Sequence, residues 1–242
     1  MTPDIRLAAA LEAAYDALSP YPVPTRLDAA PGRRPARILA DLTSAPLREL
    51  PCERIGSYAG WAITTVGVSR DYKHFLPRLL ELSVEGGCAY VGLEPFMLAG
   101  KIVHAGFGDW RPVERAAIGE VFHAAWLRSL DLPLVEAEAE NWLCGDLILG
   151  GRLPDRLAAW LANPSLEATL HIARALFSEA VRDPGHEAPG WSDLPDFART
   201  RFLQGLSGVD VRVRLEAALP LAGEDEWVVS AALDFLKAGL AS

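Results

Sequence analysis

Two pairs of acidic and histidine residues have the spacing best suited to chemistry. Glu120 and His123 form a Glu-x-x-His pair, and Asp71 and His74 form a second pair with the same spacing. This spacing places both side chains of a pair on one face of a helix. In four-helix bundles, two such pairs and further carboxylates bind two iron or manganese ions. One hypothesis is therefore a metal-dependent enzyme that uses Asp71, His74, Glu120 and His123.

The surrounding apolar pattern favours a simpler interpretation of both pairs. Glu120 and His123 lie off the apolar face of their helix, whereas Asp71 and His74 come just before Pro77, at an expected helix entry. A metal site inside a bundle needs ligands that point inward. The sequence therefore predicts no metal and no cofactor. It predicts that Asp71 caps a helix and that His74 is packed and hydrogen-bonded.

Aromatic and basic side chains are the remaining candidates for binding. Tyr72, His74, Arg78 and Trp110 are proposed as contacts for another protein. Trp61, Trp126, Trp142 and Trp160 fall within helical patterns, which predicts core packing. Trp110, Trp191 and Trp227 fall at expected helix entries, where a tryptophan either fills a corner between helices or serves as an exposed anchor for a partner.

Composition excludes several classes of protein. The formal net charge is −9, which disfavours binding to a nucleic-acid backbone. The stretch that holds Arg26, Arg33, Arg34 and Arg37 has no interleaved aromatic residue, so it is interpreted as a solvated loop. No apolar run reaches the roughly 18 residues that a membrane helix needs. The N-terminus lacks the pattern of a signal peptide.

The three cysteines, Cys52, Cys88 and Cys144, are odd in number and widely spaced. This pattern does not indicate a disulfide framework, and the absence of Cys-x-x-Cys argues against a zinc ribbon. Together with the missing signal peptide, it predicts a cytoplasmic protein.

The sequence predicts that helices carry these candidate residues. Alanine and leucine are abundant, Thr2 and Pro3 are suited to a helix start, and five prolines between residues 20 and 35 predict a loop. We expect about nine to ten helices in an all-α irregular bundle or a short repeat-like array. Residues 211–215 alternate like a strand but have no partner strand. Residues 1–242 are expected to form a single domain, with a soft boundary near 184–192.

Four segments carry a resemblance. They are YPVP at 21–24, PLREL at 46–50, TTVGVSRDYKHFLPRLLELS at 64–83 and KIVHAGFGDWRPVERAAI at 101–118. On these segments the chain resembles a family of uncharacterised bacterial all-helical proteins, over roughly residues 20–130. Many members place a cysteine cluster after the Tyr-Pro-x-Pro segment, and this chain has none there. It also has Val68 where the family has the aspartate of Gly-Asp. The resemblance implies a helical fold and no assigned activity.

These observations leave three hypotheses. The leading one is a non-enzymatic cytoplasmic helical protein that binds another protein, as an adaptor or a neutralising partner. The alternatives are the metal-dependent enzyme described above and a purely structural or oligomerisation domain. Neither a nucleic acid nor a membrane is expected as a partner, and the sequence does not specify the oligomeric state.

Overall fold

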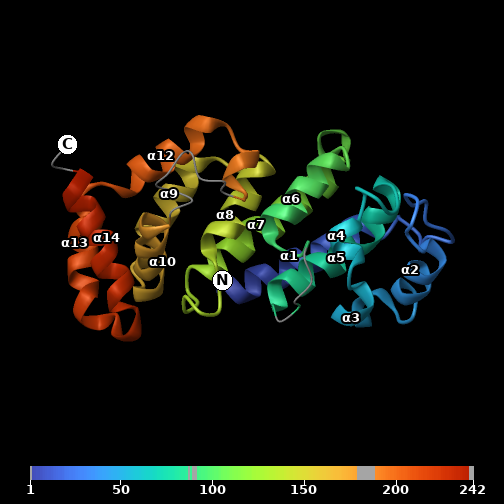
Figure 1. Ribbon diagram of the computed structural model, residues 1–242, viewed down its shortest axis with the longest axis horizontal. Helices are drawn as coiled ribbons and strands as arrows, with labels where there is room; N and C mark the ends of the chain where they lie inside the picture. The colour runs from blue at the N-terminus through green and yellow to red at the C-terminus, as the bar shows by residue number, and fades with distance from the viewer. Residues whose placement is uncertain (1, 87, 89–91, 179–188, 240–242) are drawn as a thin grey trace. The chain divides into compact units, whose positions relative to one another are not determined.

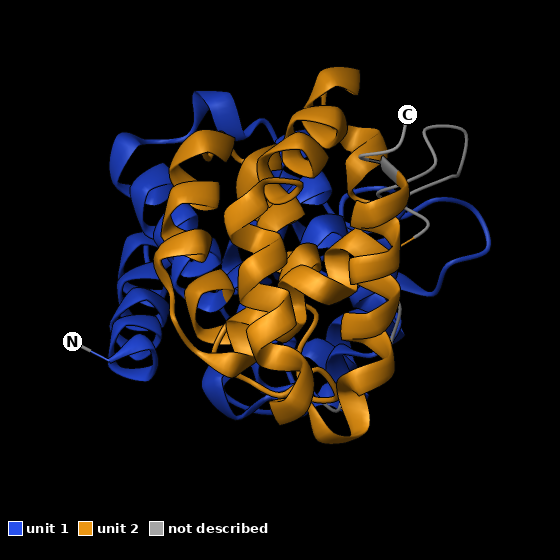
Figure 2. Ribbon diagram, turned by 90° about the vertical axis from the view of Figure 1, so that its left-hand side faces the viewer, with its two compact units in different colours: residues 1–125 blue, residues 126–242 orange. Residues whose placement is uncertain are grey.

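The all-α class predicted from the sequence is confirmed. A computed structural model describes residues 2–86, 88, 92–178 and 189–239, and these residues form thirteen α-helices and no strand (Figure 1). The chain divides into two compact units, residues 1–125 and 126–242 (Figure 2). Whether the two units behave as one domain stays a prediction, and the expected boundary near 184–192 lies mostly outside the described residues.

Unit 1 is built around the long helix α5. Its helices are α1 (Pro3–Leu18), α2 (Pro35–Leu42), α3 (Cys52–Ile55), α4 (Tyr58–Trp61), α5 (Ser69–Glu85), α6 (Pro95–His104) and α7 (Pro112–Ser129), which continues beyond residue 125. Helix α1 begins as its sequence predicts, because Thr2 Oγ1 accepts a hydrogen bond from the Ile5 amide and Pro3 occupies the first turn. Helix α5 packs against α1 and α6, and Phe75, Leu76 and Leu79 on it are completely buried.

Unit 2 is built around α10. Its helices are α8 (Ala139–Ile148), α9 (Leu153–Ala162), α10 (Leu166–Phe177), α12 (Asp196–Leu206), α13 (Val209–Ala218) and α14 (Glu226–Gly239). Helix α10 packs mainly against α14 and also against α13, α12 and α8. The predicted core role of Trp160 is confirmed, since its ring is fully buried and lies 6.2 Å from the ring of Trp126.

The structure decides three local details. Residues 211–215, which alternate like a strand but have no partner strand, belong to α13. Helix α5 begins at Ser69 and continues through Pro77, where a helix entry was expected. The described helices outnumber the expected nine or ten partly because residues 52–61 form two one-turn helices, α3 and α4. Among the described residues, no helix has both the length and the apolar character needed to cross a bilayer.

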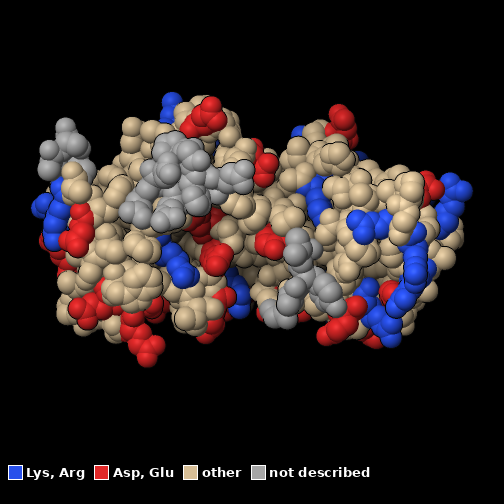
Figure 3. Space-filling view, in the orientation of Figure 1, with Lys and Arg blue, Asp and Glu red and all other residues tan. Residues whose placement is uncertain are grey.

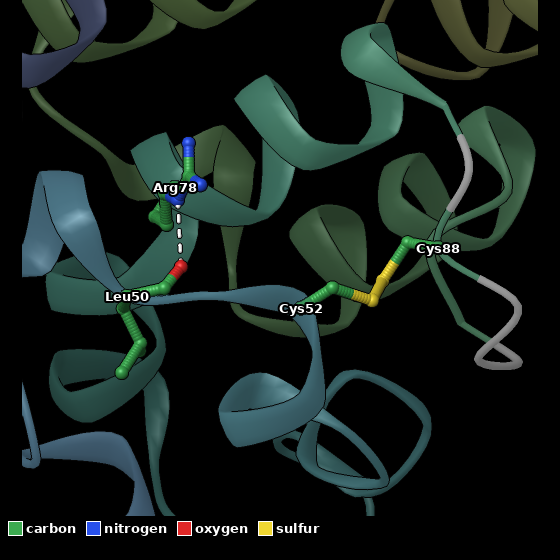
Figure 4. The surroundings of a disulfide bond; sticks show 4 residues. All are labelled: Leu50, Cys52, Arg78 and Cys88. Atoms are coloured by element: carbon green, nitrogen blue, oxygen red, sulfur yellow. Dashed lines mark hydrogen bonds between the residues drawn. A yellow bond between two sulfur atoms is a disulfide. The ribbon is translucent and has the colours of Figure 1, made fainter.

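Two of the three cysteines form a disulfide, which corrects the sequence interpretation. Cys52, the first residue of α3, is bonded to Cys88, which follows α5, and their Cα atoms lie 5.8 Å apart (Figure 4). Cys144 is free and buried on α8. An odd cysteine count excludes only a fully paired set, so the pattern carried no information about this single bond.

Candidate functional site

The four residues of the metal hypothesis make separate local contacts. Asp71 Oδ2 accepts a hydrogen bond from the Val68 amide at 3.0 Å, so Asp71 caps α5 as predicted. His74 Nδ1 lies 2.9 Å from the Tyr21 carbonyl oxygen. Glu120 forms a bidentate ion pair with Arg6, with Nε–Oε1 and Nη2–Oε2 distances of 2.6 and 3.2 Å. Throughout the described part of the chain, no three His, Cys, Asp or Glu side chains gather closely enough to hold a metal ion.

Three of the residues proposed as protein contacts lie in the interior of unit 1. Tyr72 is fully buried, and burial raises the pKa of its hydroxyl. Arg78 Nε donates to the Leu50 carbonyl oxygen at 2.9 Å (Figure 4). Arg78 Nη1 also donates to Glu81 Oε2 at 2.6 Å. The indole of Trp110 is buried and donates to the Ala105 carbonyl oxygen. Together with His74 at the Tyr21 carbonyl, these residues connect elements within the fold and do not form an exposed contact surface.

Beside them lies a buried ion network centred on Glu114. Its Oε2 accepts from Lys73 Nζ at 2.8 Å, and its Oε1 accepts from the Tyr21 hydroxyl and from Arg111 Nε, each at 2.7 Å. Burial alone raises the pKa of this carboxyl, but the hydrogen bonds from Lys73, Tyr21 and Arg111 outweigh it and lower the pKa to about 2. The Lys73 ammonium also lies 4.1 Å from the centroid of the Trp110 ring.

This network joins three of the segments that carry the family resemblance. Tyr21 comes from the first segment, Lys73 from the α5 segment, and Trp110, Arg111 and Glu114 from the segment that leads into α7. Every charged group in the network has a close partner. We therefore interpret the network as one that holds the three segments together.

An open pocket of about 370 Å³ lies elsewhere in unit 1, at the start of α2 and along α3. Six charged side chains line it: Arg33, Arg34, Arg37, Asp41, Glu53 and Arg54. Four guanidinium groups and two carboxylates leave this lining with a formal charge of +2, although the whole chain carries −9. Figure 3 shows blue side chains gathered over the α2 region of unit 1.

Two of these guanidinium groups have no partner among the residues that the structure describes. Within the described part of the chain, Arg34 and Arg37 form no side-chain hydrogen bond or ion pair, and both are exposed. Arg33 lies 3.9 Å from the centroid of the Trp61 ring, which holds it at the pocket wall. Arg54 Nη1 contacts Asp41 Oδ1 at 2.9 Å, which leaves its remaining N–H groups available.

The backbone at the start of α2 adds to this positive character. Pro35 occupies the first turn, no side chain caps the helix, and the first turn holds no acidic residue. A helix N-terminus carries partial positive charge and free N–H groups, which favours an anion nearby. Arg34 and Arg37 flank this end of α2. The helix N-terminus and the two guanidinium groups therefore all favour the binding of an anion.

The sequence interpretation missed this pocket. Residues 26–37 were expected to be a solvated loop, which holds for Arg26, whose exposed side chain pairs with Asp28 at 3.3 Å. The other three arginines line one pocket together with Arg54, which comes from α3. The only indication of a basic site in the sequence was the Arg33-Arg34 pair before Pro35. That pair does not indicate which residues line the other side of the pocket.

In unit 2, the tryptophans separate into buried and exposed groups. Trp126, Trp142, Trp160 and Trp191 are buried, whereas Trp227 is 57% exposed and its ring lies edge-on to Phe177 at 5.5 Å. His171 on α10 is buried, and its Nε2 lies 2.9 Å from the Leu132 carbonyl oxygen. His186 lies outside the described residues.

No family model matches the chain, and neither a curated protein nor a solved structure was found to be similar to it.

Proposed function

We propose that this protein binds a ligand through a phosphate group seated in the arginine pocket of unit 1. The observation that carries the proposal is the convergence of Arg33, Arg34, Arg37 and Arg54 on one pocket of about 370 Å³ in a chain of net charge −9. Guanidinium groups present several N–H donors in a plane, and this geometry matches the oxygens of a phosphate. A phosphate monoester carries a charge of about −1.5 to −2 at neutral pH, close in magnitude to the +2 of the charged lining.

Binding should be measured by isothermal titration calorimetry at low ionic strength, with inorganic phosphate and phenyl phosphate as probes. The test variant is Arg34→Gln/Arg37→Gln, which removes the two guanidinium groups that no described residue engages. The matched control is Arg26→Gln, which removes a neighbouring arginine that does not line the pocket. Each hydrogen bond to a charged group contributes about 1.5–3 kcal/mol, so we expect the double variant to bind at least tenfold more weakly, while the control binds as the wild type does.

Two results would overturn the proposal. One is that the wild-type protein binds neither probe. The other is that Arg26→Gln weakens binding as much as the double variant does, because diffuse surface charge would then explain the affinity.

A second candidate function is the binding of another protein, and the exposed pair of Trp227 and Phe177 in unit 2 favours it. Trp227 is 57% exposed, and tryptophan is enriched at the energetic centres of interfaces. A partner captured by the wild type and lost with Trp227→Ala supports an adaptor or neutralising role. Self-association of the wild type that disappears in the same variant, measured by light scattering, indicates an oligomerisation role instead.

A cytoplasmic location and membership of the bacterial family suggested by the four segments both stay proposals. The Cys52–Cys88 bond bears on the location, because reducing systems in the cytosol keep most thiols free. A lasting Cys52–Cys88 bond would therefore place the protein in an oxidising compartment, whereas in the cytosol the two thiols would be mostly reduced.

A further inference from the structure

We infer that the Cys52–Cys88 disulfide controls the arginine pocket: the oxidised pair holds the α3 wall in place for the ligand, and its reduction weakens binding. This inference rests on the proposed function, since it concerns the affinity of the same pocket.

The position of Cys52 is the first reason. Cys52 opens α3, and the residues that follow it directly, Glu53, Arg54 and Ile55, all line the pocket. Its disulfide partner, Cys88, comes after the end of α5. The bond therefore links the pocket wall to a segment of unit 1 that lies 36 residues away in the sequence (Figure 4). Both cysteines are half-buried, which leaves them partly accessible to a small thiol reagent.

The second reason is that α3 has little support of its own. It consists of four residues, and a single helical turn is not stable in isolation. On its N-terminal side, the Leu50 carbonyl accepts a hydrogen bond from Arg78 (Figure 4). Ile55 at its end is buried, while the ion pair of Arg54 with Asp41 is exposed and contributes little. Without the disulfide, Leu50 and Ile55 keep α3 attached, but Arg54 has more freedom.

Loss of this constraint reduces affinity because the ligand must then order the pocket wall on binding. A site that is already held in its binding geometry avoids that entropic cost. The effect is therefore expected on the affinity of the pocket, with the rest of unit 1 remaining folded around α5.

The redox step is a thiol–disulfide exchange with a dithiol reductant. One thiolate of the reductant attacks a sulfur of the Cys52–Cys88 bond, which forms a mixed disulfide and releases the other cysteine as a thiolate. The second thiol of the reductant then attacks the mixed disulfide. The products are two protein thiols and a cyclic disulfide of the reductant, so two electrons and two protons pass to the protein.

The test compares phenyl phosphate binding by the oxidised protein and by protein reduced with dithiothreitol, by calorimetry under anaerobic conditions. Intact-mass measurement after alkylation establishes the state of the cysteines. We expect reduction to weaken binding by about threefold to tenfold, which corresponds to the ordering of one or two side chains, and reoxidation to restore it. Cys52→Ser/Cys88→Ser should bind as the reduced protein does and show no response to dithiothreitol. Cys144→Ala should respond to it as the wild type does.

The outcomes separate this inference from the proposed function. If the oxidised protein binds no phenyl phosphate, the proposed function fails. If it binds and the confirmed reduced form has the same affinity, only redox control fails. Cysteines that stay reduced after treatment with an oxidant also overturn the inference. If the serine variant does not fold, as judged by circular dichroism, the reversible change in the wild-type protein decides.

Discussion

Replacement of Glu114 with glutamine tests the buried network of unit 1. The wild-type carboxylate is completely buried and accepts hydrogen bonds from Lys73, Tyr21 and Arg111. Its pKa falls from 4.5 to about 2, which corresponds to about 3 kcal/mol of stabilisation at neutral pH. Removal of one partner of a buried ion pair typically costs about 3–5 kcal/mol, because the other charge remains buried. We therefore expect Glu114→Gln to lose about 3 kcal/mol of unfolding free energy.

The assay is urea unfolding followed by circular dichroism, and hydrogen exchange with mass spectrometry assigns the loss to α5 and α7. Since the folded pKa of Glu114 is lowered, its contribution is complete above pH 4.5 and disappears as the pH falls towards about 2. The wild-type stability should therefore fall over this range, and the glutamine variant should lack that part of the decline.

Two further variants make the result decisive. Glu120→Gln is the matched control on the same helix, because its ion pair with Arg6 is partly exposed and is worth less than about 1 kcal/mol. Lys73→Met/Glu114→Gln removes both charges and should recover part of the lost stability. The reasoning is refuted if Glu114→Gln is as stable as Glu120→Gln, or if the double variant is no more stable than Glu114→Gln alone.

Two other predictions concern stability. Burial lowers the pKa of Lys101, whose ammonium donates to the Ala59 carbonyl, to about 8, against 10.5 in the unfolded chain. The free energy of unfolding should therefore rise as the pH increases from about 8 towards 10, and Lys101→Met should lack that rise. Equal pH dependence of urea unfolding in the wild type and Lys101→Met would contradict this prediction. Trp160→Ala should cost about 3–5 kcal/mol in urea unfolding, because the ring is fully buried, whereas Trp227→Ala should cost less than about 1 kcal/mol; similar losses would disprove this contrast.

Features that depend on neighbouring residues were predictable from the sequence. Thr2 and Pro3 predicted the start of α1, because capping and proline preferences act within one turn. Asp71 was correctly proposed as a cap for the same reason. Such local signals were sufficient for the all-α class.

Features that depend on distant residues were not predictable in this way. Cys52 and Cys88 are 36 residues apart, and His171 contacts a carbonyl 39 residues away. The arginine pocket likewise depends on Arg54 from α3 meeting residues at the start of α2. No periodicity in the sequence encodes these encounters, because they follow from the path of the loops between the helices.

The two charged clusters of unit 1 differ in one property that bears on function. In the cluster around Glu114, the carboxylate accepts hydrogen bonds from both Lys73 and Arg111, so each charged group has an oppositely charged partner within the fold. In the pocket, Asp41 forms an ion pair with Arg54, but Arg34 and Arg37 form no ion pair with any described acidic side chain. Like charges held together without compensation oppose folding, so the cluster costs stability unless an anion joins it. A bound phosphate would do for Arg34 and Arg37 what Glu114 does for Lys73. Phosphate should therefore stabilise the wild-type protein against unfolding more than it stabilises Arg34→Gln/Arg37→Gln at the same concentration, because a ligand shifts that equilibrium in proportion to its affinity for the folded state.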